Sequence, residues 1–176
     1  MKKREIDAML RRIAEGDNEA FERLYTETKR GVYAFLYTYF NNRFDCEDVM
    51  QTVYLKIKSN ISGYRFGTNA SAWILQIAKN AALNELRARA TREKYAPKES
   101  DSWYDNTERA AVRDMITSAM KRVLDEDEQR IVVLHIVWGY KHKEIAADTG
   151  APIGTITSKY KRAVEKLKKA LKEEMQ

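Results

Sequence analysis

Residues 142–172 have the sequence HKEIAADTGAPIGTITSKYKRAVEKLKKALK, and this stretch decides the fold of the C-terminal part. A short segment with apolar residues at helical spacing ends at Gly150, and a longer periodic segment begins after Pro152. Glycine commonly follows the last residue of a helix, and proline is tolerated in the first turn of one. Two helices joined by so short a turn form a helix-turn-helix. We therefore predict this arrangement, with helices over residues 142–149 and 153–172.

Helical periodicity extends through most of the remaining chain, whereas the strict alternation that is typical of strands is scarce. Asp17, Asp45 and Asp125 are predicted N-caps, and the last of them is expected to form a capping box with Glu128. The other helices are expected over about residues 6–16, 18–40, 46–57, 70–90, 112–123 and 126–138. The predicted fold class is all-α.

Residues 91–106 lack this periodicity and are rich in polar side chains around Pro97. The charge divides at the same place. Residues 1–90 hold 15 basic and 11 acidic side chains, residues 91–111 hold 4 and 5, and residues 112–176 hold 13 and 10. We predict two small helical domains, residues 1–90 and 112–176, joined by a flexible linker over residues 91–111.

The net charge of +6 in 176 residues suggests an anionic partner without identifying it. The longest run without a charged residue, residues 66–78, has 13 residues, fewer than the roughly 20 that cross a bilayer. Residues 1–7 lack the apolar centre of a signal peptide. We expect no membrane insertion and a cytoplasmic location.

The residue types that catalysis or metal binding requires are sparse. No nucleotide-binding glycine pattern occurs, and Cys46, His135 and His142 are too few for a metal cluster. We expect no enzymatic activity, no cofactor and no metal. We also expect His142 at the surface, the two histidines close to each other only in sequence, and a raised pKa for the Cys46 thiol between its acidic neighbours.

The last predicted helix has an apolar side and a polar side. Its polar side carries Thr155, Ser158, Lys161, Arg162 and Glu165. Residues 155–172 hold seven Lys or Arg against a single acidic residue. Hydroxyls and cations match the base-edge acceptors and phosphates that a DNA major groove offers. DNA binding is one interpretation, and the alternative is a basic helix that closes a bundle and faces only water.

The helix predicted over residues 70–90 carries a polar stripe. The stripe consists of Gln76, Asn80, Asn84 and Arg87, with Trp73 one turn earlier and Tyr64, Arg65 and Phe66 in the preceding loop. Amides suit base edges, and aromatic rings stack on unpaired bases. Single-strand recognition is therefore one interpretation. The alternative is a core tryptophan beside amides that face water.

Residues 45–56 (DCEDVMQTVYLK), 72–87 (AWILQIAKNAALNELR) and 139–159, which contain GY, EIA and PIGTITSK, follow one another in a specific order and spacing. Together they resemble the extracytoplasmic-function (ECF) sigma factors of bacterial RNA polymerase, a compact two-domain branch of the sigma-70-type group. The first block resembles the helix that docks on the clamp coiled coil of the core polymerase. The second resembles the helix for minus-ten recognition and promoter melting, and the third the helix-turn-helix for the minus-thirty-five element.

The resemblance implies a factor that binds core polymerase, directs it to particular promoters and helps to open the duplex. Polymerase would be contacted by Asp45, Glu47, Asp48 and Gln51. The minus-ten element would be contacted by Tyr64, Arg65, Trp73, Gln76, Lys79, Asn80, Asn84 and Arg87. The minus-thirty-five element would be contacted by Thr155, Thr157, Ser158, Lys159, Lys161 and Arg162.

The resemblance also implies that a base of the nontemplate strand is extruded into a pocket formed partly by residues 62–71. The polymerase flap and an anti-sigma factor are further implied partners. Several positions depart from the family pattern. Among them, Lys141 replaces the usual Ser or Thr cap, His135 and Thr157 stand where arginine is common, Thr52 replaces an acid of the docking helix, and Lys161 replaces a common aromatic residue. A helix-turn-helix regulator that does not bind polymerase and a helical protein adaptor are the alternative functions.

Overall fold

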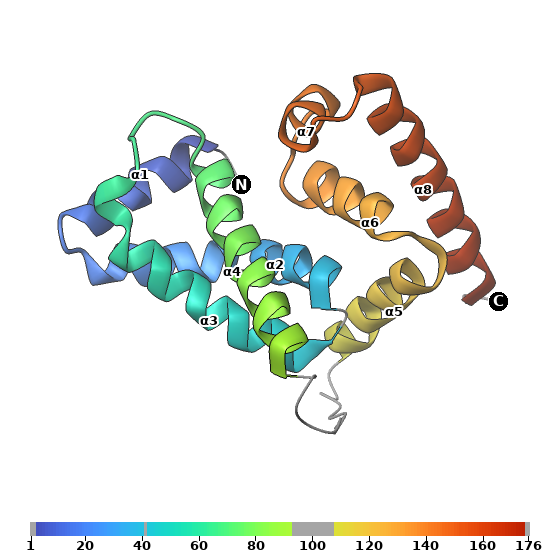
Figure 1. Ribbon diagram of the computed structural model, residues 1–176, viewed down its shortest axis with the longest axis horizontal. Helices are drawn as coiled ribbons and strands as arrows, with labels where there is room; N and C mark the ends of the chain where they lie inside the picture. Colours follow the sequence, from blue (N-terminus) through green and yellow to red (C-terminus); the bar gives the residue numbers. More distant parts are fainter. Residues whose placement is uncertain (1–2, 41, 93–107, 175–176) are drawn as a thin grey trace. The chain divides into compact units, whose positions relative to one another are not determined.

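The computed structural model describes residues 3–40, 42–92 and 108–174. These residues form helices and short helical turns, and no strand occurs among them (Figure 1). The predicted all-α class is confirmed. The chain divides into two compact units, Met1–Tyr95 and Ala96–Gln176.

The predicted linker over residues 91–111 falls for the most part outside the described residues. Its two described ends are helical, because one helix continues to Arg92 and the next begins at Glu108.

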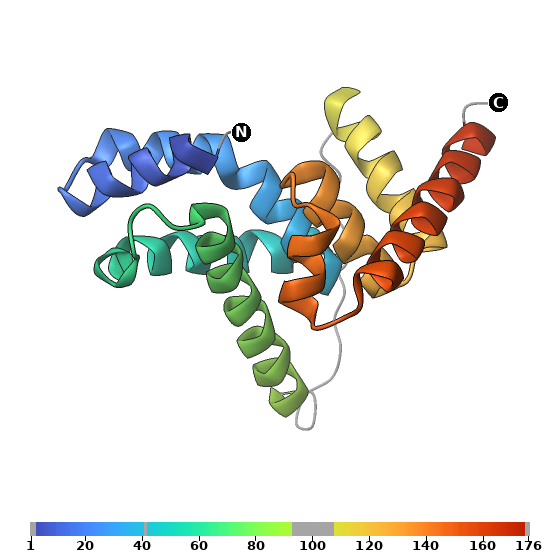
Figure 2. The ribbon, with the colours of Figure 1, turned by 90° about the horizontal axis from the view of Figure 1, so that it is seen from above.

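The first unit contains α1 (Lys3–Ala14), α2 (Asn18–Phe40), α3 (Arg43–Ser59), the short 3-10 turn η1 (Ile61–Gly63) and α4 (Ala70–Arg92). Helix α2 packs against the other three helices, and α1 lies along it (Figure 2). The core consists of fully buried aliphatic side chains, among them Ile6, Leu10, Leu24, Leu36, Ile57 and Ile74. In α1 the buried residues Ile6, Met9, Leu10 and Ile13 recur at intervals of three or four, which places them on one side of the helix.

Short polar side chains begin the helices of this unit. Asp17 accepts a hydrogen bond of 3.0 Å from the backbone N–H of Ala20, as predicted for the start of α2. The N-cap of α3 is Asn42, whose side chain accepts a 2.9 Å hydrogen bond from the backbone N–H of Asp45. The predicted cap at Asp45 is therefore wrong, because Asn42 already satisfies the free N–H groups of the first turn.

Polar atoms inside the first unit are paired. Thr28 Oγ1 donates to the carbonyl oxygen of Leu24 at 2.6 Å and accepts from the Tyr54 hydroxyl at 2.6 Å, which ties α2 to α3.

Cys46 is fully buried. Burial, with smaller contributions from Asp45 and Glu47, raises the pKa of its thiol to about 12, in the direction that the sequence indicated.

The second unit contains α5 (Glu108–Val123), α6 (Glu126–Val132), the π-helical turn η2 (Val133–Val137), α7 (His142–Thr149) and α8 (Ile153–Glu174). Helix α8 packs against α5, α6 and α7. The core of the second unit contains the buried residues Leu124, Val132 and Ala163, and the partly buried Met120, Val123, Tyr160 and Leu167 pack around them.

The predicted capping box of α6 is present. Asp125 Oδ1 accepts from the backbone N–H of Glu128 at 2.8 Å, and the Glu128 carboxylate accepts from the backbone N–H of Asp125 at 3.2 Å. The same buried carboxylate forms an ion pair with Lys166 of α8 at 2.7 Å. One glutamate thus begins α6 and ties it to α8.

The helix-turn-helix is confirmed. Gly150 ends α7 with φ of +72°, a left-handed conformation that glycine adopts without strain. The carbonyl oxygen of Pro152 then accepts from the N–H of Thr155 at 2.9 Å and begins α8. Lys141 supplies no side-chain acceptor to α7, but the Glu144 carboxylate accepts from the Lys141 backbone N–H at 2.8 Å. Of the two hydrogen bonds of a capping box, α7 therefore has the one accepted by Glu144 and lacks the one that a Ser or Thr side chain at position 141 would accept.

Candidate nucleic-acid interface

The outer side of α8 presents polar groups to solvent. Thr155, Ser158, Lys161 and Arg162 are exposed, whereas Ile156 and Ala163 are buried on the opposite side. Within the described part of the chain, neither Lys161 nor Arg162 has an ion-pair partner. Their charges are therefore available to an external anion.

Two of the residues predicted to contact the minus-thirty-five element are engaged inside the second unit instead. Thr157 Oγ1 donates to the carbonyl oxygen of Ile153 at 2.9 Å and lies 3.2 Å from His142 Nδ1. Lys159 Nζ forms a 2.6 Å ion pair with Asp127 of α6, and this hydrogen bond raises the pKa of the lysine. Of the six predicted residues, Thr155, Ser158, Lys161 and Arg162 are exposed, and Thr157 and Lys159 make contacts within the second unit.

The two histidines lie against each other, contrary to the sequence expectation. The ring centroids of His135 and His142 are 4.6 Å apart, and Tyr160 packs on both at 4.6 and 4.9 Å. His135 Nδ1 lies 2.6 Å from the carbonyl oxygen of Tyr140. A carbonyl only accepts, so this nitrogen carries the hydrogen. His135 is therefore a packing residue of η2 in this structure, and no phosphate contact is indicated for it.

His142 is half-buried, and the prediction of a surface histidine is wrong. Because the Thr157 hydroxyl donates to Ile153, its oxygen accepts from His142 Nδ1, which places the hydrogen on that nitrogen. His142 Nε2 is buried without a hydrogen-bond partner. Burial and, to a lesser degree, the neighbouring His135 lower the pKa of His142 from its ordinary value of 6.5.

The lowered pKa of His142 predicts acid sensitivity of the second unit. The unfolded chain takes up a proton more readily than the folded chain, so the free energy of unfolding falls as the pH drops below about 6.5. We expect His142→Asn, whose amide can still donate to Thr157, to weaken this dependence. Urea unfolding at pH 7.5 and 5.5 measures it. Equal pH dependence in both proteins would contradict the assignment to His142.

Helix α4 presents the polar stripe that the sequence predicts. Gln76, Asn80, Asn84 and Arg87 are all exposed, while Trp73 and Lys79 are half-buried. Gln76 Nε2 donates to Asn80 Oδ1 at 2.9 Å. This bond uses the Gln76 NH₂ group and the Asn80 carbonyl oxygen, so the Asn80 NH₂ group and the Gln76 carbonyl oxygen remain available.

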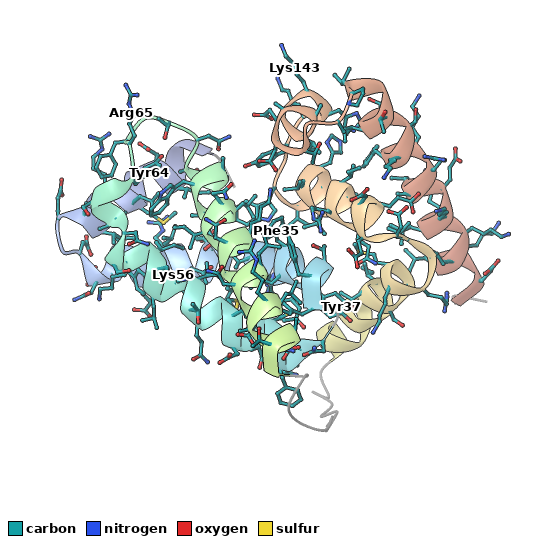
Figure 3. The ribbon with its side chains drawn as sticks, in the orientation of Figure 1. Phe35, Tyr37, Lys56, Tyr64, Arg65 and Lys143 are labelled. Atoms are coloured by element: carbon teal, nitrogen blue, oxygen red, sulfur yellow. The ribbon has the colours of Figure 1, made fainter. Side chains whose placement is uncertain are left out.

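The loop before α4 differs from its prediction at one residue. Tyr64 is 4% exposed, with its ring 4.9 Å from that of Trp73, so it offers no free face to a base. Arg65 is exposed, and Figure 3 shows its side chain on the outer side of the loop while Tyr64 lies inside. The Phe66 ring packs edge-on against Tyr64 at 5.3 Å and is 36% exposed. Tyr64 is thus buried against Trp73 at the base of this loop.

The acidic residues of α3 fall into two kinds. Asp45 forms an ion pair with Arg89 of α4, which also binds Glu85 at 2.9 Å. Burial opposes ionisation of Asp45, yet hydrogen bonds from Arg89 and Asn42 hold its pKa below the usual value. Glu47 pairs with Arg43 at 2.7 Å. Asp48 and Gln51 are exposed on the side away from the core.

Two apolar residues that the sequence interpretation missed lie beside Asp48 and Gln51. Phe44 is 50% exposed and Leu55 is 68% exposed. The positions 44, 48, 51 and 55 follow the i, i+4, i+7, i+11 spacing that places side chains in one row along a helix. We call this row the α3 stripe. That spacing, opposite the buried Val49, was the signal that could have identified it.

The described residues thus form two helical units, with exposed polar side chains on α4 and on α8 and a row of exposed side chains on α3. The model of sigma-70 region 2 matches residues 24–92, and that of sigma-70 region 4 matches residues 114–167. No helix among the described residues is both long and apolar enough to span a bilayer.

Several curated proteins are similar over nearly their whole length. The RNA polymerase sigma factor CarQ of Myxococcus xanthus is 30% identical, with 93% of this chain and 96% of the relative covered. The ECF RNA polymerase sigma-E factor of Haemophilus influenzae is 28% identical, with 90% of each covered. The chain belongs to the ECF sigma factors of the sigma-70 family. It is a transcription initiation factor that acts with RNA polymerase at specific promoters, and such factors are DNA-binding and generally not enzymes.

Solved structures share the fold. CnrH, determined in complex with the cytosolic domain of CnrY, is 19% identical with a TM-score of 0.64, and 96% of this chain and 98% of that chain are covered. The sigma factor RpoE of Bartonella quintana, determined with the anti-sigma factor NepR, is 22% identical with a TM-score of 0.66, and the coverage is 86% and 96%.

Proposed function

We propose that the three exposed faces divide the work of initiation. The α3 stripe docks on the clamp coiled coil of core polymerase, the α4 stripe with its preceding loop contacts the minus-ten element, and the outer side of α8 contacts the minus-thirty-five element. The observation that carries this proposal is that each face consists of exposed side chains, while the residues around them are paired inside their own unit.

The α8 face supports groove recognition by its chemistry. Arg162 can donate two parallel hydrogen bonds to a guanine edge, Ser158 can donate or accept, and Lys161 suits a phosphate. Because Thr157 and Lys159 are held by His142 and Asp127, the recognising groups stand on a helix that is fixed at its N-terminal half. A fixed helix loses less conformational freedom when it binds.

Arg162→Ala tests this face. In the reconstituted holoenzyme we expect discrimination among minus-thirty-five variants to fall by roughly 1–3 kcal/mol, because a bidentate base contact is lost. Binding or transcription on a set of minus-thirty-five sequences measures it. Lys168→Ala, an exposed cation of the same helix, is the control, and any weakening that it causes should be equal for all sequences. Unchanged discrimination in Arg162→Ala would reject the base contact.

The α4 face supports contact with separated strands. The oriented Gln76 and Asn80 amides offer both a donor and an acceptor, and Phe66 and Arg65 provide a ring and a cation at the adjacent loop. Unstacking a base costs a few kcal/mol, which stacking and hydrogen bonds to the extruded base offset. We therefore place promoter opening on the first unit.

An anti-sigma factor is the inhibitory partner that we propose. Exposed apolar side chains occur on both units: Phe44 and Leu55 on the first, Ile136, Val137 and Ile153 on the second. Such residues mark protein interaction sites when they gather on a surface. The structural neighbours CnrH and RpoE were determined with CnrY and the anti-sigma factor NepR, respectively. The site of action that follows from this function is the cytoplasm, where polymerase works.

A further inference from the structure

Asp7 of α1 lies outside the region-2 match over residues 24–92, yet its carboxylate reaches the loop before α4. Asp7 Oδ1 accepts a 2.7 Å hydrogen bond from the Tyr64 hydroxyl and a 2.9 Å hydrogen bond from the backbone N–H of Gly67. One oxygen atom thus binds both ends of a four-residue segment. Figure 1 shows this loop beside α1, and η1 contacts the same helix.

The segment held by Asp7 carries the aromatic rings of the minus-ten face. Tyr64 packs on Trp73 at 4.9 Å and against Phe66 at 5.3 Å. Arg11, one turn after Asp7, lies 5.0 Å over the Phe66 ring and 3.8 Å from the Asp7 carboxylate. Gly67 has φ of +82°, a left-handed conformation that residues other than glycine rarely adopt. The hydrogen bond from the Gly67 N–H to Asp7 helps to hold the turn in this conformation.

These partners stabilise the ionised form of Asp7. The Tyr64 hydrogen bond is the largest influence and lowers the pKa of Asp7, and the Gly67 N–H and Arg11 act in the same direction against burial. The Asp7 side chain is 18% exposed. An anion near the path of DNA would repel phosphate, but here it is covered by two donors and a guanidinium. Its geometry suits holding the loop rather than touching the nucleic acid.

We propose that Asp7 is the positioning residue of the minus-ten face: it holds residues 64–67 in the shape that receives an unpaired base. This inference rests on the proposed function of α4. Without the carboxylate, Tyr64 and the Gly67 N–H lose their shared acceptor, and the loop must be ordered when the strand binds. That ordering reduces affinity for single-stranded DNA while the α3 stripe keeps its affinity for polymerase.

The experiment measures binding of the holoenzyme to a fluorescent single-stranded minus-ten oligonucleotide. We expect Asp7→Ala to weaken binding by roughly fivefold or more, with unchanged affinity for core polymerase. Asp7→Asn keeps an acceptor oxygen and should restore most of the binding. Glu15→Ala, which removes an equal charge from an exposed position just after α1, is the matched control and should bind as wild type.

Asn80→Ala separates failure of this inference from failure of the proposed function. If Asn80→Ala loses binding and Asp7→Ala does not, the positioning role of Asp7 is rejected while the α4 face stands. If neither variant loses binding, the minus-ten assignment of α4 falls as well. If Asp7→Ala weakens oligonucleotide binding and polymerase binding equally, Asp7 only stabilises the unit and the proposal is overturned. The proposal is also overturned if Asp7→Asn binds the oligonucleotide as weakly as Asp7→Ala.

Discussion

Asp48→Arg should weaken binding of the chain to purified core RNA polymerase by roughly thirtyfold or more, about 2 kcal/mol or above, with no DNA present. Asp48 is exposed in the middle of the α3 stripe. A basic docking surface would attract the aspartate and repel the arginine, so the reversal replaces a favourable charge pair with an unfavourable one. Fluorescence anisotropy of labelled protein titrated with core enzyme measures the change.

Glu22→Arg is the matched control, since it reverses an exposed acidic residue of α2 on the same unit. It should bind within about twofold of wild type if long-range charge is a minor influence. Leu55→Ala tests the apolar part of the stripe, and a loss there would show that the row acts together. Folded wild type that fails to bind core polymerase would favour the helix-turn-helix regulator.

Asp45→Arg is a poor probe of the same interface. Asp45 is bound to Arg89, so its reversal would place two cations together and disturb the contact between α3 and α4. Loss of polymerase binding in that variant would not distinguish a docking contact from a structural one. Asp48 has no such partner among the described residues, and this difference decides the choice of variant.

Ile145→Ala should destabilise the second unit by about 2–5 kcal/mol, the range for truncation of a fully buried aliphatic side chain. Ile145 has no exposed surface and lies in the middle of α7. Helix α7 has eight residues, too few to be stable by itself. Its position beside α8 therefore depends on burial of side chains such as Ile145, and minus-thirty-five recognition should decline when that side chain is truncated.

Hydrogen exchange followed by mass spectrometry locates the loss. Peptides from α6 to α8 should exchange more than tenfold faster, because about 1.4 kcal/mol corresponds to a factor of ten. Peptides from α1 to α4 should be unchanged. Ile153→Ala removes the same side chain from a position that is 52% exposed, and it should change stability by no more than about 0.5 kcal/mol. Equal effects of the two variants would contradict the packing role of Ile145.

The helices and the polar sides of α4 and α8 could be predicted because their determinants are local. A residue three or four positions from the next faces the same side, so Asn80 and Arg162 are placed by spacing alone. The turn at Gly150 and the capping box at Asp125 are local for the same reason. Their signals lie within a few residues of one another, and a single sequence contains them completely.

The errors concern contacts between distant residues. From the sequence, Asp45 is expected to cap α3, but Asn42 takes that place, and the Asp45 carboxylate instead binds Arg89, 44 positions away. Tyr64 looks like a free ring until Asp7 and Trp73 cover it. The histidines meet because η2 and α7 both pack on Tyr160 of α8. Periodicity shows which side of a helix faces the core, but it does not show which residues of another helix pack against that side.

The burial of Cys46 bears on how this factor is switched on. The chain has one cysteine, and its thiol is enclosed between α3 and the core with a pKa of about 12. At cellular pH it is almost never a thiolate, the form that peroxide attacks. The Cys46 thiol of the folded protein is therefore a poor target for peroxide. We therefore expect no oxidative switch at this cysteine while the first unit is folded.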